Sequence, residues 1–286
     1  MDRRDLLGGA AVLAAALAGL AREAEAQASA SPTAPTDAVV PPPEGHVMDH
    51  MPAHWRGSER IAFLLYPGFT ALDLVGPHYM LASLIGASVH LVARTKDPVA
   101  SDQNLVLVPS DDFETCPRDL DILCVPGGTA GTLAAMGDAA TLRFVKDRGG
   151  RARFVTSVCT GSLILGAAGL LEGHRATSHW LTRDVLPVFG AIPTPGRVVR
   201  DRNRITGGGV TAGIDFGLGL LGELRDRTYA ETVQLLAEYA PEPPFDAGTP
   251  ERAPPAVTGM MDAMFATFRR TAAAEARAAF AMGRTL

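Results

Sequence analysis

Short apolar runs, each bounded by small or turn-forming residues, recur along the sequence and constrain its fold more than any other feature. They are RIAFLLY (60–66), SVHLVA (88–93), NLVLVP (104–109), DILCVPGG (121–128), RFVTSV (153–158) and RITGG (204–208). Runs of this length suit strands that are buried on both faces of a sheet. Helical patterns separate them, and strands that alternate with helices are typical of a mostly parallel sheet. The sequence therefore predicts an α/β fold, a three-layer sandwich with helices on both faces of the sheet.

Helical periodicity fills the intervals between the apolar runs. We expect helices over 73–84, 138–148, 161–171, 179–189, 212–224, 228–239 and 256–284. The polar turn inside VRDRNRI (199–205) predicts a β-hairpin, which would add an antiparallel strand to the sheet. The last helix carries methionines and phenylalanines at helical spacing, so we expect it to dock on the domain or on a second subunit.

The first 28 residues have the pattern of an export signal. Arg3 and Arg4 precede an apolar run from Leu6 to Ala21, and small residues around Ala26 and Ala28 offer cleavage positions. Paired arginines before leucines resemble the twin-arginine type of signal. We therefore expect a periplasmic or secreted protein with no stable membrane span after signal removal. A membrane anchor is the alternative, although the apolar run is shorter than the ~20 residues that cross a bilayer.

The rest of the chain divides into three parts by composition. Residues 29–58 contain a linker rich in proline and alanine and, at its end, an entry segment with histidines and methionines. Residues 59–245 form the predicted α/β domain, in which no shift of composition marks a second domain. Residues 246–286 form a C-terminal extension and helix.

Charge and cysteine content limit the partners of the chain. The 286 residues carry a formal net charge of −5, and their basic residues are scattered, so we expect no nucleic-acid partner. The three cysteines are Cys116, Cys124 and Cys159. An odd number leaves at least one free thiol, even in a compartment that permits disulfides.

The stretch SVCTGS (157–162) has the pattern of a nucleophile elbow. A strand that ends at Val158 and a helix that begins at Gly161 would place Cys159 on a sharp turn, which requires small neighbours such as Ser157 and Gly161. The N-terminus of that helix would lower the pKa of the thiol. A buried structural cysteine is the alternative interpretation.

Two other stretches bring polar groups to the same edge of the sheet. VPGGT (125–129) follows a strand, and the backbone amides of Gly128 and Thr160 are candidates for an oxyanion hole, although Pro-Gly-Gly also forms ordinary turns. YPGFTALDLVGP (66–77) places Asp73 just after the first strand, where it serves as an acid or base or as the N-cap of a helix. In a parallel sheet, ligands bind at the carboxyl ends of the strands.

These stretches, together with three longer ones, resemble the ThiJ/PfpI superfamily, which has the class I glutamine amidotransferase-like fold of flavodoxin type. The longer stretches are SVCTGSLILGAAGLLEGHRATSHW (157–180), ITGGGVTAGIDFGLGLLGEL (205–224) and YAPEPPFDAGTPE (239–251). Within the superfamily the chain looks most like the isonitrile hydratases and the ligand domains of AraC-type regulators. The resemblance extends from about residue 60 to 253.

The resemblance implies a role for five residues. Cys159 matches the nucleophile, and Asp73 matches an acidic partner that is aspartate in isonitrile hydratases and glutamate in many other members. Thr160 matches the threonine that follows the cysteine in that group, and Gly128 falls at the oxyanion position. His179 matches a histidine near the nucleophile in several branches, although a histidine before tryptophan is more often a packing residue. The lack of histidine after Cys159 disfavours a peptidase, and aspartate at position 73 disfavours a glyoxalase.

The implied activity is a cysteine-dependent hydratase of small molecules, converting an isonitrile to an N-substituted formamide. The Cys159 thiolate would attack the terminal carbon while Asp73 supplies a proton, with no cofactor. The resemblance also implies a homodimer. The alternatives are a non-catalytic periplasmic protein that binds a small ligand, and an enzyme of the glyoxalase or deglycase type.

A separate cluster lies before the domain, in HVMDHMPAHW (46–55). His46, His50 and His54 are four residues apart and would share one face of a helix, a pattern that suits a late transition metal. Pro52 argues against a continuous helix. The alternative is a segment with exposed histidines and no metal.

Overall fold

A computed structural model describes residues 51–286. The predicted export signal, the linker up to residue 50, and His46 and His50 lie outside the described residues.

The described chain is built on a seven-stranded sheet with the order β10-β11-β7-β6-β1-β2-β5. All neighbours are parallel except β10 and β11, which confirms both the mostly parallel sheet and the hairpin. The strands are β1 Arg60–Leu64, β2 Ser88–Ala93, β5 Asp111–Asp112, β6 Ile122–Val125, β7 Phe154–Val158, β10 Val198–Asp201 and β11 Arg204–Gly207. All residues of β6 and β7 are buried, as expected for strands covered on both faces.

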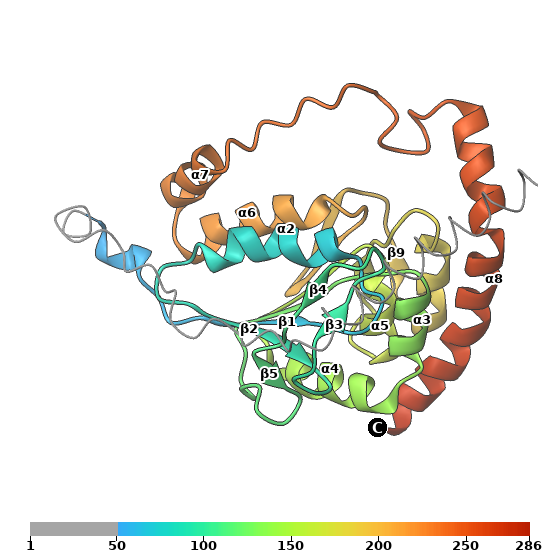
Figure 1. Cartoon of the computed structure of the whole chain (residues 1–286), viewed down its shortest axis with the longest axis horizontal. Helices are drawn as coiled ribbons and strands as arrows, with labels where there is room; N and C mark the ends of the chain where they lie inside the picture. Colours follow the sequence, from blue (N-terminus) through green and yellow to red (C-terminus); the bar gives the residue numbers. More distant parts are fainter. Residues whose placement is uncertain (1–50) are drawn as a thin grey trace, which may run out of the picture. The chain divides into compact units, whose positions relative to one another are not determined.

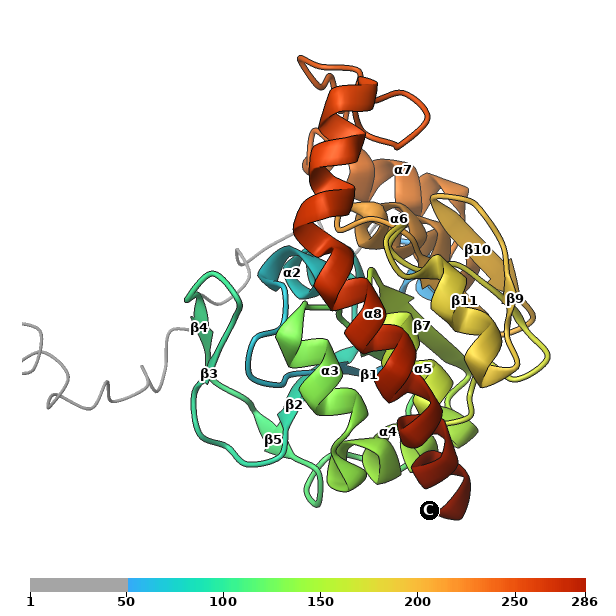
Figure 2. The same cartoon turned by 90° about the vertical axis from the view of Figure 1, so that its right-hand side faces the viewer.

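Helices cover both faces of the sheet, which confirms the three-layer sandwich (Figures 1 and 2). One layer contains α2 Ala71–Ala82 and α6 Ala212–Leu224, with α7 Arg227–Leu236 beside α6. The other contains α3 Ala130–Met136, α4 Ala139–Arg151, α5 Gly161–Ala167 and α8 Pro255–Thr285. The second half of α8 packs on its own domain through small residues, namely Ala272, Ala276, Ala279 and Gly283.

Two predicted elements were wrong. The run 104–109 forms only the short strand β4 Val106–Leu107, which pairs with β3 Val99–Ala100 in a separate ribbon. Its apolar side chains are largely exposed among residues 51–286, where no described element covers it as the central strands are covered. The range 179–189 contains a 3-10 helix, η3 Arg183–Phe189, with Pro187 inside it. Proline lacks the N–H that an α-helical bond needs, and its ring clashes with the preceding turn.

Other boundaries also differ from the predictions. The helix α3 and the strand β5 were not predicted, and both are short. The helix α5 ends at Ala167 instead of residue 171, and Gly169 with φ 78° follows in a left-handed conformation. The turn residue Arg202 of the predicted hairpin also has a positive φ, 57°.

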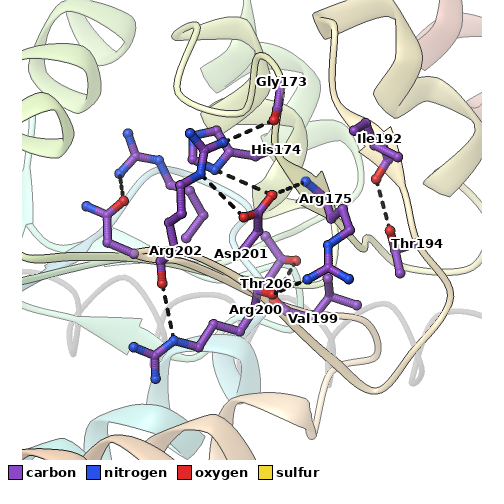
Figure 3. Close-up of polar contacts among 12 residues, drawn as sticks. Gly173, His174, Arg175, Ile192, Thr194, Val199, Arg200, Asp201, Arg202 and Thr206 are labelled. Carbon is purple, nitrogen blue, oxygen red and sulfur yellow. Dashed lines mark hydrogen bonds and ion pairs between the residues drawn. The ribbon is translucent and has the colours of Figure 1, made fainter.

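Polar contacts fix the β10–β11 hairpin to the loop after α5 (Figure 3). Asp201 Oδ2 accepts the backbone N–H of Arg175 at 2.8 Å, and Arg202 Nη2 donates to the carbonyl oxygen of Gly173 at 3.0 Å. The ring of His174 lies 3.9 Å from the same Asp201 oxygen. The edge of the sheet is therefore held by the loop between α5 and η3.

Within residues 51–286, no helix has both the length and the apolar character needed to cross a membrane.

Candidate active site

Cys159 lies on the sharp turn that the sequence predicts. The strand β7 ends at Val158, α5 begins at Gly161, and Cys159 between them has φ 57°, a left-handed conformation that is strained for a residue with a side chain. Its N–H donates to the Gly207 carbonyl oxygen of β11 at 3.0 Å. This is the nucleophile-elbow geometry.

The turn also requires a residue without a side chain two positions after the cysteine. A Cβ on Gly161 would overlap the Val125 carbonyl oxygen and lie 2.6 Å from the Pro126 oxygen, at the end of β6. Ser157, two positions before Cys159, is fully buried. The small residues on both sides of Cys159 thus allow the elbow to pack against the neighbouring strand.

Asp73 lies in the first turn of α2, next to the elbow. The N-cap of α2 is Thr70, so the interpretation of Asp73 as an N-cap was wrong. The carboxyl group is 1% exposed, and its Oδ2 accepts the N–H of Gly127 at 2.8 Å. The turn after β6 therefore holds Asp73 through its backbone.

Burial makes Asp73 and Cys159 a coupled acid–base pair. Burial raises the pKa of Asp73 to about 7, against the Gly127 N–H bond, which lowers it. Burial and, after it, the charge of Asp73 raise the pKa of the Cys159 thiol well above its ordinary value. The predicted lowering of the thiol pKa was wrong, because burial raises this pKa by more than the hydrogen bond from the Thr160 amide lowers it. The helix α5 has only seven residues, so its dipole is weak. Near neutral pH the pair keeps its thiol proton while Asp73 titrates.

Thr160 and Gly128 contact each other directly. The Thr160 hydroxyl donates to the Gly128 carbonyl oxygen at 2.6 Å, and the Gly128 N–H donates back to Thr160 Oγ1 at 2.9 Å. The Gly128 N–H is therefore directed at a protein side chain. The Thr160 N–H lies near the sulfur, where it lowers the pKa of Cys159.

His179 contacts Cys159 through its backbone. Its N–H donates to the Cys159 carbonyl oxygen at 3.3 Å, and its ring Nδ1 accepts the Leu181 N–H at 3.4 Å. Burial lowers the pKa of the half-buried ring, so the imidazole is neutral at neutral pH. A direct catalytic role of the ring stays a prediction.

Sequence reasoning missed two hydroxyl groups behind this site. Thr132 Oγ1 lies 2.9 Å from Thr160 Oγ1, and Tyr66 Oη lies 3.1 Å from Thr132 Oγ1. Thr132 belongs to α3, which was not predicted, so no signal in the sequence placed it near Cys159. Tyr66 begins the stretch YPGFTALDLVGP (66–77), but only the fold reveals that its hydroxyl contacts Thr132.

The remaining candidates lie away from the elbow. Cys116 and Cys124 are free and buried, and burial raises the pKa of their thiols to about 11 and about 12. His54 Nε2 lies 2.5 Å from Asp226 Oδ2. From residue 51 onward, no cluster of three histidine, cysteine or acidic side chains is arranged to hold a metal ion. The metal site proposed for His46, His50 and His54 stays a prediction.

The fold and the elbow define a class of protein, an α/β sandwich with a cysteine on the strand-to-helix turn at the carboxyl edge of its sheet. The chain belongs to the DJ-1/PfpI family, whose profile matches residues 59–223.

Individual relatives narrow this assignment. The chain is 56% identical over 198 residues to an isonitrile hydratase of Pseudomonas putida, and the aligned region covers 69% of this chain and 86% of that protein. It matches the crystal structure of a ThiJ/PfpI family protein from Pseudomonas syringae with 57% identity and a TM-score of 0.78, covering 86% of this chain and 98% of the other. It is also 28% identical over 197 residues to the transcriptional regulator GbdR of Pseudomonas aeruginosa, of which it spans 53%.

Proposed function

We propose that this chain is an isonitrile hydratase, an enzyme that adds water to an isonitrile and releases an N-substituted formamide. The observation that carries the proposal is the Asp73–Cys159 pair, a carboxyl with a pKa of about 7 beside a protonated thiol on an elbow. The 56% identity with the Pseudomonas putida isonitrile hydratase supports the same reaction.

The first step forms a covalent adduct. The Cys159 sulfur bonds to the terminal carbon of R–N≡C, and the thiol proton passes through the Asp73 carboxylate to that same carbon. The product is the thioimidate R–N=CH–S–Cys159. A protonated thiol beside an ionisable carboxyl suits this step, because both the nucleophile and the proton must reach one atom.

The second step adds water and releases the product. The Asp73 carboxylate takes a proton from water as the oxygen bonds to the thioimidate carbon, and the nitrogen receives a proton. The C–S bond then breaks, the O–H proton returns to the pair, and R–NH–CHO leaves with the thiol restored. The sum is one isonitrile and one water to one formamide, with no redox change and no cofactor.

The test uses purified protein with cyclohexyl isonitrile, and N-cyclohexylformamide is followed by NMR. We expect turnover by the wild type, none by Cys159→Ala, and a strong loss in Asp73→Asn. Unchanged turnover by Cys159→Ala would falsify the mechanism. Binding without any formamide from the wild type would favour the small-ligand-binding alternative, which the likeness to GbdR over part of its length supports.

We also propose export by the twin-arginine route to the periplasm, on the sequence pattern of residues 1–28. The test is fractionation of cells that express the full chain. The wild type should appear in the periplasmic fraction, and the pair Arg3→Lys and Arg4→Lys should leave it inside the cell. Equal distribution of both forms would contradict the proposal.

We further propose a homodimer. Val257, Met260 and Met264 on the first half of α8 are 41%, 56% and 66% exposed, and a second copy would cover such side chains. Sedimentation should give a dimer for the wild type and a monomer for Met264→Glu. A monomeric wild type at micromolar concentration would contradict it.

A further inference from the structure

Three buried hydroxyl groups form a chain that leads to the elbow. Tyr66 Oη lies 3.1 Å from Thr132 Oγ1, which lies 2.9 Å from Thr160 Oγ1. The three residues are 5%, 0% and 3% exposed. They come from the loop after β1, from α3 and from the turn before α5, so the chain joins three segments that are distant in sequence.

The protons of this chain can be assigned from its acceptors. The Tyr66 hydroxyl donates to the Pro126 carbonyl oxygen at 2.8 Å, and the Thr160 hydroxyl donates to the Gly128 carbonyl oxygen at 2.6 Å. Each hydroxyl has one proton, so the Thr132 proton must serve one of its two hydroxyl contacts. Thr160 Oγ1 also accepts the Gly128 N–H. The Thr160 hydroxyl is therefore occupied by protein partners.

These bonds fix the backbone on both sides of Gly127. The Tyr66 hydroxyl holds the Pro126 carbonyl oxygen, the Thr160 hydroxyl holds the Gly128 carbonyl oxygen, and the Gly127 oxygen accepts the Thr70 N–H at 2.7 Å. The Gly127 N–H is then directed at Asp73 Oδ2. A Cβ on Gly127 would lie 2.6 Å from the Thr160 nitrogen and 2.8 Å from that carboxyl oxygen. The Gly127 backbone thus lies between the elbow and the acid.

We propose that Tyr66 and Thr132 are positioning residues of the Asp73–Cys159 site. Tyr66 holds the Pro126 carbonyl oxygen directly, and Thr132 holds the Thr160 hydroxyl that bonds Gly128, so that the Gly127 N–H points at Asp73. The kinetic part of this proposal rests on the proposed hydratase function. Both side chains are buried, and each acts through the turn.

The expected consequence is a change in the protonation of Asp73. The Gly127 N–H bond lowers the pKa of Asp73 against burial, so a looser turn raises that pKa further above its ordinary value. The other titratable groups that act on Asp73 are Cys159 on the elbow, Asp102 in the β3–β4 ribbon and Tyr66 after β1. Replacing Thr132 by valine leaves all three in place.

The experiment compares Thr132→Val with the wild type by two pH profiles. One is kcat/KM for cyclohexyl isonitrile. The other is the rate at which iodoacetamide alkylates Cys159 in the folded protein, quantified afterwards in the peptide that contains Cys159. We expect the acid limb of both profiles to move to higher pH by about half a unit or more, with kcat lowered more than KM is changed. Thr132→Ser keeps the hydroxyl and should restore the wild-type profile, and Tyr66→Phe should shift it in the same direction.

Thr141→Val is the matched control, because it removes a threonine hydroxyl that bonds Asp138 at 2.7 Å at the start of α4. It should lower stability without moving either profile. A folded Thr132→Val protein with the wild-type alkylation profile would overturn the positioning role. If the alkylation limb moves but the wild type makes no formamide, the hydratase proposal fails and the positioning role stands.

Discussion

At the scale of single residues, the site depends on two groups whose pKa values are both raised by burial. Cys159 and Asp73 could be picked out from the sequence because a cysteine between small residues and an acid after a strand have recognisable patterns. The raised pKa values of Cys159 and Asp73 could not be predicted from the sequence, because the burial of both groups depends on how α2, β6 and α5 pack together. The same holds for the contact between Thr160 and Thr132, which lie 28 positions apart in sequence.

Asp73 should make the stability of the protein depend on pH. Its pKa of about 7 in the folded protein lies above the ordinary 3.8, so its contribution to stability is complete below pH 3.8 and is lost as the pH rises through 7. The free energy of unfolding should fall by roughly 3 kcal/mol from this cause between pH 5 and pH 8. Asp73→Asn cannot ionise and should therefore gain about that much relative to the wild type over this range, as measured by urea unfolding at the two pH values.

The control for this measurement is Asp119→Asn, since the Asp119 side chain is 70% exposed. It should leave the pH dependence unchanged. Parallel pH curves for the wild type and Asp73→Asn would show that Asp73 is not held in its neutral form by the fold.

At the scale of elements, burial decided which predictions held. Strands β6 and β7 are mostly apolar and buried on both faces, so their sequences were sufficient to predict them as strands. The run around β4 has the same apolar character, but Leu105, Val106 and Val108 are about half exposed in the described part of the chain, and periodicity alone could not reveal this exposure. The helix α3 has seven residues, too few for a helical period to stand out.

A buried ion pair joins the segment before β1 to the end of α6. Arg225 donates to both Glu59 oxygens, at 2.6 and 2.7 Å, and its side chain is 2% exposed. Arg225→Met would leave the Glu59 charge buried without a partner, so we expect a loss of about 3–5 kcal/mol in the free energy of unfolding. Urea titration measures this loss.

Arg227→Met supplies the comparison two positions further along the chain. Arg227 pairs with Glu231 at 2.6 Å, but its side chain is 90% exposed, and such pairs contribute below about 1 kcal/mol. Equal losses in the two variants would mean that the Glu59–Arg225 pair is not a structural clamp.

At the scale of the whole molecule, the sequence predicted the long helix α8 to within one residue at each end but not the surface on which it docks. Its apolar pattern predicted docking, but left open whether on the domain or on a second subunit. In the structure the second half of α8 docks on the same chain, because a stripe of small residues lets it approach α5 closely. Lys146 of α4 also donates a hydrogen bond to the Gly283 carbonyl oxygen of α8 at 2.9 Å. Small residues have a weak hydrophobic signal, and their partner surface is formed only once the sheet and α5 are in place.

The docking of α8 can be tested with two identical substitutions in the same helix. A Cβ on Gly283 would overlap the Ala167 carbonyl oxygen and lie 3.0 Å from its carbon, and backbone atoms cannot move aside easily, whereas Gly259 has no neighbour within 4 Å. Gly283→Ala should therefore destabilise the protein by roughly 1–3 kcal/mol through overpacking. Gly259→Ala should stabilise it by up to about 1 kcal/mol through helix propensity. Thermal unfolding measures both, and trypsin should cleave after Arg269, Arg270 and Arg277 faster in Gly283→Ala if α8 separates from α5. Equal effects of the two substitutions would mean that α8 does not rest on α5 at this register.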